Sequence, residues 1–400
     1  MTRAETDTMT LPRELLEAFS RAFPNQAPDV FVRAPGRVNL LGGHVDIHGG
    51  PVINITIDRG IWVAAAYGAS DLVRLHAADL GEETTFSLGR LDEHCDVVGE
   101  DLPRWALYPA GVAWGLQKRG LKVNGINVAF LGNLAMRAGL SSSAAVEEAF
   151  AVAWQALEGL RLDMVEMAEL GQQVEREYMG LSTGIQDQFT CLHGRADHAL
   201  WLDCRTLDFC YPVLPRSARV VICDTGTRRE LGRSNYGGRA GDAHEAAHTI
   251  RMLDKRVKTL RDVSPERLED FRGVLTDDQY RRARHVVTEI ARVASGLEAL
   301  EDGDMAGFGA LMNQSYWSAR DDYGSSSPAL DVMWDAAHDH PACYGARYSG
   351  GGEAGAVVAL VERAAVDDFI ATVSVAYERR SGHAGNLLAV DPAPGAGVFL

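Results

Sequence analysis

The chain has 400 residues, and 46% of them are hydrophobic. That length exceeds what one core usually holds, so we expect two domains. The formal net charge of −16 at pH 7 argues against nucleic acid and against an anionic membrane as partners. The six cysteines form no CxxC pair, and no apolar leader or membrane-length apolar run is present, so we expect free thiols in a cytoplasmic protein.

Hydrophobic periodicity predicts secondary structure along the whole chain. Helices are predicted over 11–23, 105–118, 143–159, 162–178, 240–252, 280–300, 305–320, 328–338 and 364–380. Strands are predicted over 30–34, 52–57, 61–67, 72–77, 124–130, 198–203, 219–224 and 356–360. Strands and helices do not alternate one for one, so the pattern favours an α+β fold over a doubly wound parallel sheet.

A serine-rich loop precedes the predicted helix 143–159. Its sequence over 139–143 is GLSSS, and it follows the predicted strand 124–130. A small-residue loop at a helix start presents free backbone N–H groups and the positive end of the helix dipole, which bind phosphate well. The alternative is an ordinary serine N-cap. One cap needs one serine rather than three, so the pattern favours phosphate.

A second stretch, residues 33–50, combines five glycines with a dense set of polar side chains. These side chains are Arg37, Asn39, His44, Asp46 and His48. They could form a pocket for a polyol, or His44, Asp46 and His48 could share one face of a strand and bind a metal ion. They could also be the solvated side chains of a hairpin. The spacing alone leaves these three interpretations open.

Two other stretches carry candidate chemistry. Three glycines at 350–352 precede a buried strand, which indicates either a close backbone or ligand contact or a wide turn. Glu175 and Asp187 flank a predicted chain reversal, where one could hold a metal ion and the other act as a base. Both could instead be solvated acids. Neither a P-loop nor a strand-linked GxGxxG motif is present.

Residues 35–40, 139–145 and 350–352, in this order, resemble the three motifs of the GHMP small-molecule kinases, most closely those of galactokinases. Further matching segments are 103–105, 184–189, 223–226, 234–236 and 320–323. The resemblance implies an N-terminal domain like ribosomal protein S5 domain 2 and a ferredoxin-like C-terminal domain, with the active site between them. We expect the two domains at 11–200 and 201–400.

The resemblance also implies ATP, Mg²⁺ and phosphoryl transfer to a sugar hydroxyl, at C1 in galactokinases. Asp187 matches the catalytic aspartate, and Arg37 matches the arginine beside it. Ser143 and Glu175 match the Mg²⁺ ligands. The expected nucleotide contacts are Trp105, Tyr108, Arg137, Gly139, Leu140, Ser141, Ser142 and Ser143, and the expected sugar contacts are Gly43, His44, Asp46, His48, Gly184 and Tyr236. The expected partners are a sugar and ATP, in a monomer or homodimer.

The chain departs from the galactokinase pattern at Gly43, where the family has a glutamate that contacts the hydroxymethyl end of galactose. Other departures are Ile47, His48, Glu353, Ala354 and Tyr316. The loss of the glutamate would open space at the far end of the sugar. We therefore hypothesise an acceptor extended beyond C5, a heptose or octose that could carry a phosphate there and meet His48.

Three other functions remain as alternatives. The first is galactokinase activity proper. The second is a catalytically inactive sugar sensor, although relatives of that kind typically damage the serine-rich loop, which is complete here. The third is a metal-dependent hydrolase built on His44, Asp46 and His48, which would leave the serine-rich and glycine-rich stretches unexplained.

Overall fold

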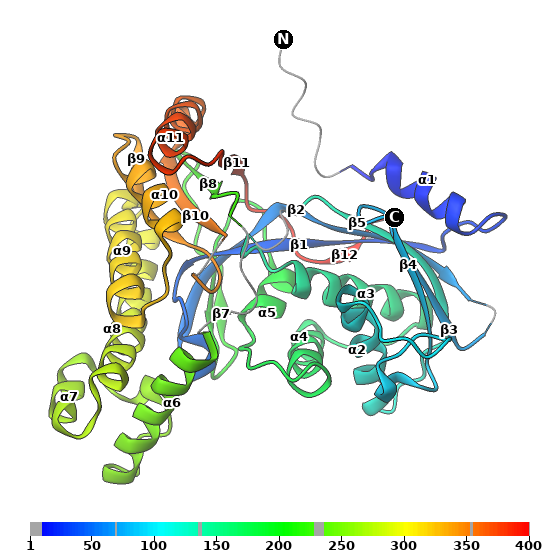
Figure 1. The fold of residues 1–400 in the computed structure, drawn as a ribbon, viewed down its shortest axis with the longest axis horizontal. Helices are drawn as coiled ribbons and strands as arrows, with labels where there is room; N and C mark the ends of the chain where they lie inside the picture. The colour runs from blue at the N-terminus through cyan, green and yellow to red at the C-terminus, as the bar shows by residue number, and fades with distance from the viewer. Residues whose placement is uncertain (1–9, 69, 135–137, 228–235, 353–354, 400) are drawn as a thin grey trace.

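The computed structural model describes residues 10–68, 70–134, 138–227, 236–352 and 355–399. Figure 1 shows a long twisted sheet with helices beneath it and, at one end, a second sheet flanked by a stack of helices. This mixture confirms the predicted α+β class. In the part of the chain that the structure describes, no helix is long and apolar enough to cross a membrane.

The first sheet has eight strands, in the order β12-β1-β2-β5-β3-β4, with β6 added beside β2 and β7 beside β6. The strands are β1 (Val30–Leu41), β2 (Pro51–Tyr67), β3 (Leu72–Ala77), β4 (Glu82–Ser87), β5 (Ile126–Gly132), β6 (Leu200–Asp203), β7 (Phe209–Cys210) and β12 (Gly397–Val398). All pairs are antiparallel except β3 with β5.

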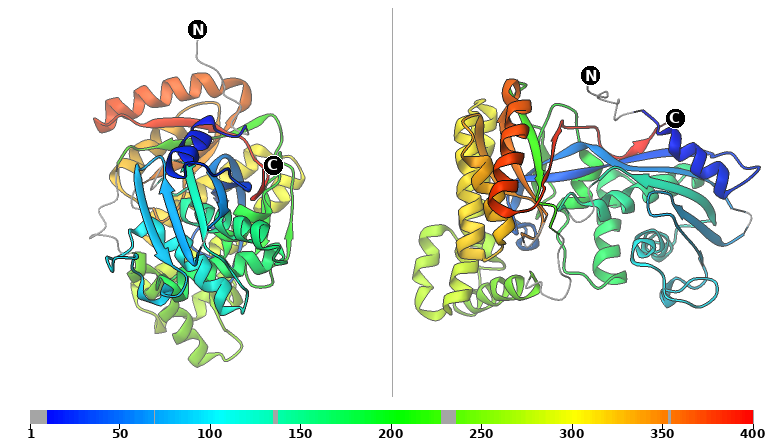
Figure 2. Two further views of the ribbon diagram at one scale, coloured as in Figure 1. Left: turned by 90° about the vertical axis from the view of Figure 1, so that its right-hand side faces the viewer. Right: turned by 45° about the horizontal axis from the view of Figure 1, so that its top comes forward.

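Both faces of this sheet are covered, as the alternation along β2 shows. Val63 and Ala65 belong to the main core, whereas Trp62 and Ala64 pack with α1 on the other face, because successive side chains of a strand point to opposite sides. Helix α1 (Arg13–Ala22) covers one face, and the helices α2–α5 lie on the other (Figures 1 and 2). Their bounds are α2 (Arg104–Lys118), α3 (Ser142–Glu158), α4 (Met164–Gln173) and α5 (Gln186–His193).

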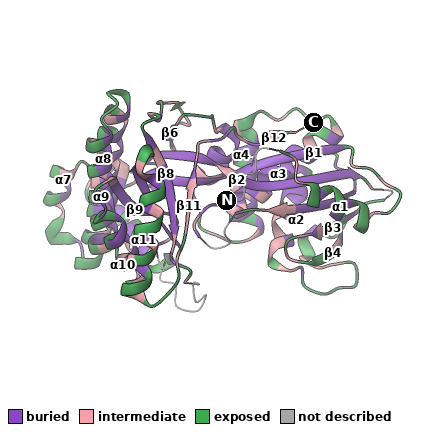
Figure 3. Cartoon of the chain, turned by 90° about the horizontal axis from the view of Figure 1, so that it is seen from above, coloured by how far each residue is buried: buried purple, intermediate pink, exposed green. Residues whose placement is uncertain are grey.

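The second sheet has four antiparallel strands in the order β11-β8-β10-β9. They are β8 (Ala218–Asp224), β9 (Cys343–Tyr348), β10 (Ala356–Glu362) and β11 (Asn386–Val390). The accompanying helices are α6 (Tyr236–Leu253), α7 (Pro265–Asp270), α8 (Asp277–Glu301), α9 (Met305–Ser318), α10 (Pro328–His338) and α11 (Val366–Ser381). Figure 3 shows buried strands at the centre, whereas much of α11 is exposed.

Three local predictions were incomplete. β1 does not stop at Pro35 and Gly36 but continues past them, with a register shift between Pro35 and Arg37, so the proline sits at an irregularity of the strand, where it is tolerated. The two strands predicted over 52–57 and 61–67 form one long strand, β2. The helix predicted over 162–178 is α4 followed by a π-helical turn, Val174–Tyr178.

The division of the chain at residue 200 stays a prediction. β6 and β7 follow that point in the sequence and join the first sheet, and β12, near the C-terminal end, pairs with β1. The cores of the two sheets are therefore connected by strands that return from the second half of the chain.

Candidate active site

A cavity of about 240 Å³ lies where elements of the two sheets meet. It brings together seven of the residues predicted from the sequence. They are Arg37, Gly43, His44, Asp46, Glu175, Gly184 and Asp187. Gly350 and Gly351 of the third glycine-rich stretch also line it, as does Arg347 of β9. The cavity therefore contains residues from all the stretches that the sequence singled out except the serine-rich loop. That loop contacts a cavity residue, because Ser141 donates a hydrogen bond to Asp187.

Asp187, near the start of α5, is held by two residues. Arg37 on β1 donates to its Oδ1 from Nε (2.8 Å) and Nη2 (2.6 Å), and Ser141 Oγ donates to its Oδ2 (2.6 Å). The Arg37 side chain is 6% exposed, whereas that of Asp187 is 28% exposed. The arginine is thus a buried support, and the carboxylate keeps access to the cavity.

The serine-rich loop is tied to this pair. Arg37 also donates from Nη1 to the Gly139 carbonyl (2.8 Å). Ser141 precedes α3 with a left-handed backbone (φ +54°), and its side chain does not cap the helix. The ordinary N-cap interpretation of this serine is therefore wrong, because its hydroxyl bonds Asp187 instead. Arg137 lies outside the described residues.

The third glycine-rich stretch packs directly on this loop. A Cβ on Gly139 would collide with the Ser349 carbonyl, and one on Gly350 would lie 2.9 Å from the Gly139 Cα. Ser349 Oγ donates to the Gly139 carbonyl (2.8 Å). The glycines are therefore needed for a close backbone contact between the two loops, rather than for a wide turn.

Glu175 lies in the π-helical turn after α4 and is buried. Burial raises the pKa of Glu175, and the nearby Asp187 charge raises it further, while hydrogen bonds, one of them with Ser143, oppose the shift. A cation between Glu175 and Asp187 would relieve this repulsion. The donor set, a carboxylate and a hydroxyl, suits a hard cation such as Mg²⁺.

Two buried carboxyls behind Glu175 were not singled out from the sequence. Glu147 and Glu148 of α3 have no exposed surface. Gln188 donates to Glu147 (3.0 Å), whereas neither oxygen of Glu148 has a partner. Burial raises the pKa of both carboxyls well above the usual range, with Glu175 adding to it. The only available signal was a pair of glutamates inside an alanine-rich helix.

His44 and Asp46 both line the cavity, and burial shifts their pKa values in opposite directions. His44 Nε2 is close to the hydroxyls of Tyr348 (3.0 Å) and Ser325 (3.1 Å), and its ring stacks on Tyr323. Burial lowers the pKa of His44 well below its usual value. Burial and the Asp187 charge raise the pKa of Asp46 to about 6. Gly184 has no side chain because a Cβ there would collide with the Asp46 carboxylate.

The metal site postulated on His44, Asp46 and His48 is not formed. Residues 46–48 are a 3-10 turn rather than a strand, so the three side chains do not share one face. His48 packs against His244, with ring centroids 4.8 Å apart, and does not line the cavity. Within the described residues, no three acidic, histidine or cysteine side chains converge on a metal position.

The space beside Gly43 is filled rather than open. A Cβ on Gly43 would collide with the Arg347 guanidinium. The backbone N–H groups of Gly42 and Gly43 donate to Glu289 (2.9 and 3.1 Å), and His285 Nε2 lies 3.1 Å from the Gly43 carbonyl. The sequence did not reveal Arg347, Glu289 or His285, because contacts between such distant segments leave no local pattern.

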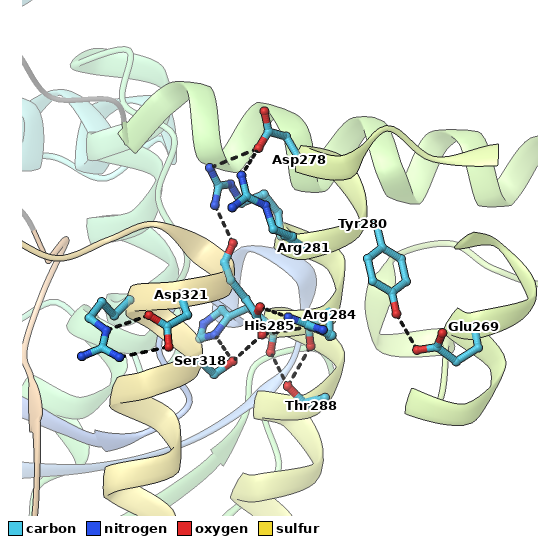
Figure 4. A network of polar contacts seen from close by, with 12 residues as sticks. Glu269, Asp278, Tyr280, Arg281, Arg284, His285, Thr288, Ser318 and Asp321 are labelled. Carbon is cyan, nitrogen blue, oxygen red and sulfur yellow. Dashed lines mark hydrogen bonds and ion pairs between the residues drawn. The ribbon is translucent and has the colours of Figure 1, made fainter. Parts of the chain in front are cut away.

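The Gly43 carbonyl is contacted by His285 of α8, and His285 in turn meets Ser318 at the end of α9 (Figure 4). Since Nε2 of His285 donates to a carbonyl, its Nδ1 accepts from Ser318 Oγ (3.0 Å). Burial lowers the pKa of His285 to about 4, so the ring is neutral at pH 7. Burial alone would raise the pKa of Glu289, but Arg292 and Arg347 bring it below the usual range.

The remaining predicted residues lie away from this cavity or outside the description. Trp105 and Tyr108 are on α2, and neither lines the cavity. The Trp105 indole N–H donates to Glu82 of β4, and burial raises the pKa of Tyr108. Tyr236 is the first residue of α6.

The other nucleotide contacts expected in the serine-rich loop lie at the start of α3. Leu140 is buried, and its carbonyl accepts from the Arg37 N–H (3.1 Å). Ser142 and Ser143 begin α3.

Comparison with known proteins gives consistent matches over the chain. Residues 17–67 match the galactokinase galactose-binding signature, residues 108–195 the GHMP kinases N terminal domain, and residues 297–378 the GHMP kinases C terminal domain. The galactokinase of Roseiflexus sp. is 38% identical over 387 residues, which cover 97% of each chain. That of Chloroflexus aggregans is 37% identical over 91% of this chain and 92% of its own.

Solved structures agree. Lactococcus lactis galactokinase complexed with galactose superposes with a TM-score of 0.89 at 29% identity, over 95% of this chain and 98% of that one. Methanococcus jannaschii mevalonate kinase, at 16% identity, gives a TM-score of 0.63 over 93% and 100% of the two chains and shares the fold. The two-domain GHMP kinase fold is therefore confirmed.

These findings correct one prediction. The acceptor was expected to be a heptose or octose rather than galactose, and this is wrong, since the relatives at 37–38% identity are galactokinases and the chain carries the galactose-binding signature. The physical reason lies at Gly43. The missing side chain does not leave room for a longer sugar, because the Arg347 guanidinium takes that room.

Proposed function

The chain belongs to the galactokinase family of the GHMP kinases, and from that premise we propose that it transfers the γ-phosphoryl group of ATP to the C1 hydroxyl of galactose. The observation that carries the proposal is the Asp187 carboxylate, which Arg37 and Ser141 hold at the edge of the cavity. A fixed, half-exposed carboxylate beside a buried cation is suited to a hydroxyl that is about to attack a phosphoryl group.

Asp187 orients the C1 hydroxyl and accepts its proton. Arg37 and Ser141 occupy only part of its acceptor capacity, since two carboxylate oxygens offer about four lone-pair positions. The Arg37 charge also stabilises the negative charge of the transferring phosphoryl group. Because phosphoryl transfer depends mainly on positioning and charge neutralisation, these residues need no covalent step.

The triphosphate would bind at the N-terminal end of α3. Residues 139–143 bring backbone N–H groups to that end, where the helix dipole favours anions, and Arg37 joins the loop to Asp187 through the Gly139 carbonyl. Ser143 and Glu175 would hold Mg²⁺, which neutralises charge on the phosphate oxygens when bound. Trp105 and Tyr108 remain the proposed region for the adenine, and Arg137, outside the described residues, stays an expected nucleotide contact.

The sugar would bind between His44, Asp46 and Gly184. The ionised Asp46 accepts hydrogen bonds from sugar hydroxyls, and the absence of a side chain at Gly184 makes room for the Asp46 carboxylate beside the cavity. Tyr236 stays an expected sugar contact, and its side chain lies outside the structural description. His48 is left out of the proposed site, because its ring packs on His244 away from the cavity.

The test is release of ADP from ATP and Mg²⁺ on addition of galactose. Asp187→Asn should lower kcat by about 100-fold or more, the scale of a lost general base, and calorimetry should still detect galactose binding. A wild-type protein that binds galactose without releasing ADP would instead be a sugar sensor. One that neither binds nor phosphorylates galactose would contradict both functions.

A further inference from the structure

Arg347 is a buried cation with most of its donors unused. It lies on β9 with 2% of its surface exposed. Its Nη1 donates to the Asn39 carbonyl (3.3 Å) and to Asn39 Oδ1. A guanidinium has five N–H donors. Among the described residues, Nε has no acceptor, and only Nη1 makes hydrogen bonds.

A nearby carboxylate balances the charge of Arg347 but makes no hydrogen bond with it. The N–H groups of Nε and Nη2 are therefore not used in an ion pair. Glu289 supplies the compensating charge, and it also serves Arg292 and the N–H groups of Gly42 and Gly43. Glu289 makes no hydrogen bond with Arg347, whereas Arg292 donates to it at 2.7 Å. Buried N–H groups without an acceptor are costly, so the unused donors of Arg347 call for an oxygen that enters from the cavity.

Gly43 is what gives the guanidinium this access. The Nη2 atom is the nearest neighbour of the position that a Gly43 Cβ would take, and the two would collide. The backbone at Gly43 cannot retreat, because Glu289 holds its N–H and His285 holds its carbonyl. Ser318 Oγ holds the other ring nitrogen of His285 in turn (Figure 4). The position of the Arg347 guanidinium therefore depends on residue 43 being a glycine.

We infer that Arg347 is a substrate-binding residue, which donates from Nη2 to one hydroxyl oxygen of the acceptor sugar other than the hydroxyl that is phosphorylated. The inference rests on the proposed function, since the cavity that Arg347 lines is the one that holds Arg37 and Asp187. The sugar is then held from two sides, by Asp46 of the 3-10 turn between β1 and β2 and by Arg347 of β9 in the second sheet.

The experiment compares galactose with its 2-, 3-, 4- and 6-deoxy forms. The proteins are the wild type, Arg347→Lys, Gly43→Ala and the control Arg292→Lys, which alters the same Glu289 pair without lining the cavity. Both kcat/KM at saturating ATP and calorimetric affinity are measured for each sugar. Thermal melting checks that each variant is folded, and Gly43→Ala leaves every charge in place should Arg347→Lys fold poorly.

One deoxy sugar should lose about 10- to 100-fold in the wild type, the scale of a hydrogen bond to a charged donor. Arg347→Lys and Gly43→Ala should lose a similar factor with galactose but nothing further with that deoxy sugar, while Arg292→Lys keeps the wild-type pattern. The inference would be overturned if Arg347→Lys lost the same factor in kcat/KM with all five sugars, or if it lost nothing with any of them. A wild type that fails to phosphorylate galactose refutes the proposed function separately, and the calorimetric comparison still decides the role of Arg347.

Discussion

Asp46 and Asp187 line one cavity, and the charge of Asp187 disfavours ionisation of Asp46. Burial and Asp187 together raise the pKa of Asp46 to about 6, close to physiological pH. An Asp46 that accepts hydrogen bonds from sugar hydroxyls does so best when ionised. Sugar binding should therefore depend on pH in a range where most carboxylates do not titrate.

We expect kcat/KM for galactose to fall as the pH drops through about 6, approaching tenfold per pH unit, because kcat/KM reports the ionisation of the free enzyme. Asp46→Asn should be less active but flat over the same range. Rates measured from pH 5 to 8 at saturating ATP check this. An unchanged wild-type profile between pH 5.5 and 7.5 would contradict a role for the ionised Asp46.

Glu175 and Glu177 offer a matched pair on one π-helical turn. Glu175 is buried near Ser143 and Asp187, whereas Glu177 is exposed and accepts from Gln173. Glu175→Gln should raise the Mg²⁺ concentration for half-maximal rate by at least about tenfold, the scale of disturbed metal sites. Glu177→Gln should leave it unchanged. Titrating MgCl₂ at fixed ATP distinguishes the two, and an equal effect of both variants would refute the assignment of Glu175.

For single residues, the sequence predicted those that lie in a short recognisable motif. Arg37, Asp46 and Asp187 were recognised and do share the cavity. Arg347 and Glu289 were missed, since an arginine on a strand and a glutamate on a helix carry no local sign of a partner hundreds of residues away. His48, expected as a sugar contact, ends a 3-10 turn, packs on His244 and does not line the cavity.

Helix α3, which follows the serine-rich loop, also holds two fully buried carboxyls, Glu147 and Glu148. The carboxyl of Glu148 has no hydrogen-bond partner and lies against Gly171 of α4, where a Cβ would lie 2.5 Å from its Oε1. Burial raises its pKa well above the usual range, so the charged form of this carboxyl is disfavoured in the folded protein. An element this close to the site thus contains a destabilising group.

Replacing Glu148 should stabilise the protein. The raised folded pKa means that its contribution is most favourable below the unfolded pKa and is lost as the pH rises towards the folded pKa. Glu148→Leu should therefore gain about 1–3 kcal/mol, the cost of an unsatisfied buried polar group, with a larger gain at pH 8 than at pH 5. Urea unfolding at both pH values measures it.

The control for this prediction is Glu158→Gln at the end of the same helix, whose carboxylate accepts from Asn124. It should give no gain at either pH. A Glu148→Leu variant that is less stable than the wild type would mean that the carboxyl has a partner in solution.

Most of the elements could be predicted from periodicity, because α3, α8 and β5 have long regular patterns. The exceptions involve backbone geometry that periodicity does not encode. β1 continues through Pro35 and Gly36 because Gly60, its neighbour on β2, allows the strands to approach closely at the irregularity. The π-helical turn at 174–178 looks like ordinary helix in the sequence.

At the scale of the whole molecule, Glu289 on α8 joins the two halves of the site. It is fully buried, accepts from the N–H groups of Gly42 and Gly43, from Ser315 Oγ (2.6 Å) and from Arg292, and compensates Arg347. Removing its charge would leave the buried Arg347 and the partly buried Arg292 with too little negative charge. Such a loss is costly because an uncompensated buried charge cannot be solvated.

Glu289→Gln should therefore destabilise the protein by about 3–5 kcal/mol, as expected for a broken buried ion pair, and should weaken sugar binding with it. The lowered pKa of Glu289 adds stability that is present above the unfolded pKa and lost as the pH falls, so the difference between variant and wild type should shrink in acid. Urea unfolding at pH 7 and pH 4 measures the loss of stability and its pH dependence. Glu301→Gln, at the exposed end of α8, is the control and should change little.

The contact between Gly139 and Gly350 has a consequence for the order of synthesis. The loop that would cradle the triphosphate is braced by residues 349 and 350, which leave the ribosome long after the loop itself. A nascent chain that ends before β9 thus has the serine-rich motif without its brace, and without Arg347. Nucleotide and sugar affinity should therefore emerge together and late, and a truncated product would have little capacity to consume ATP.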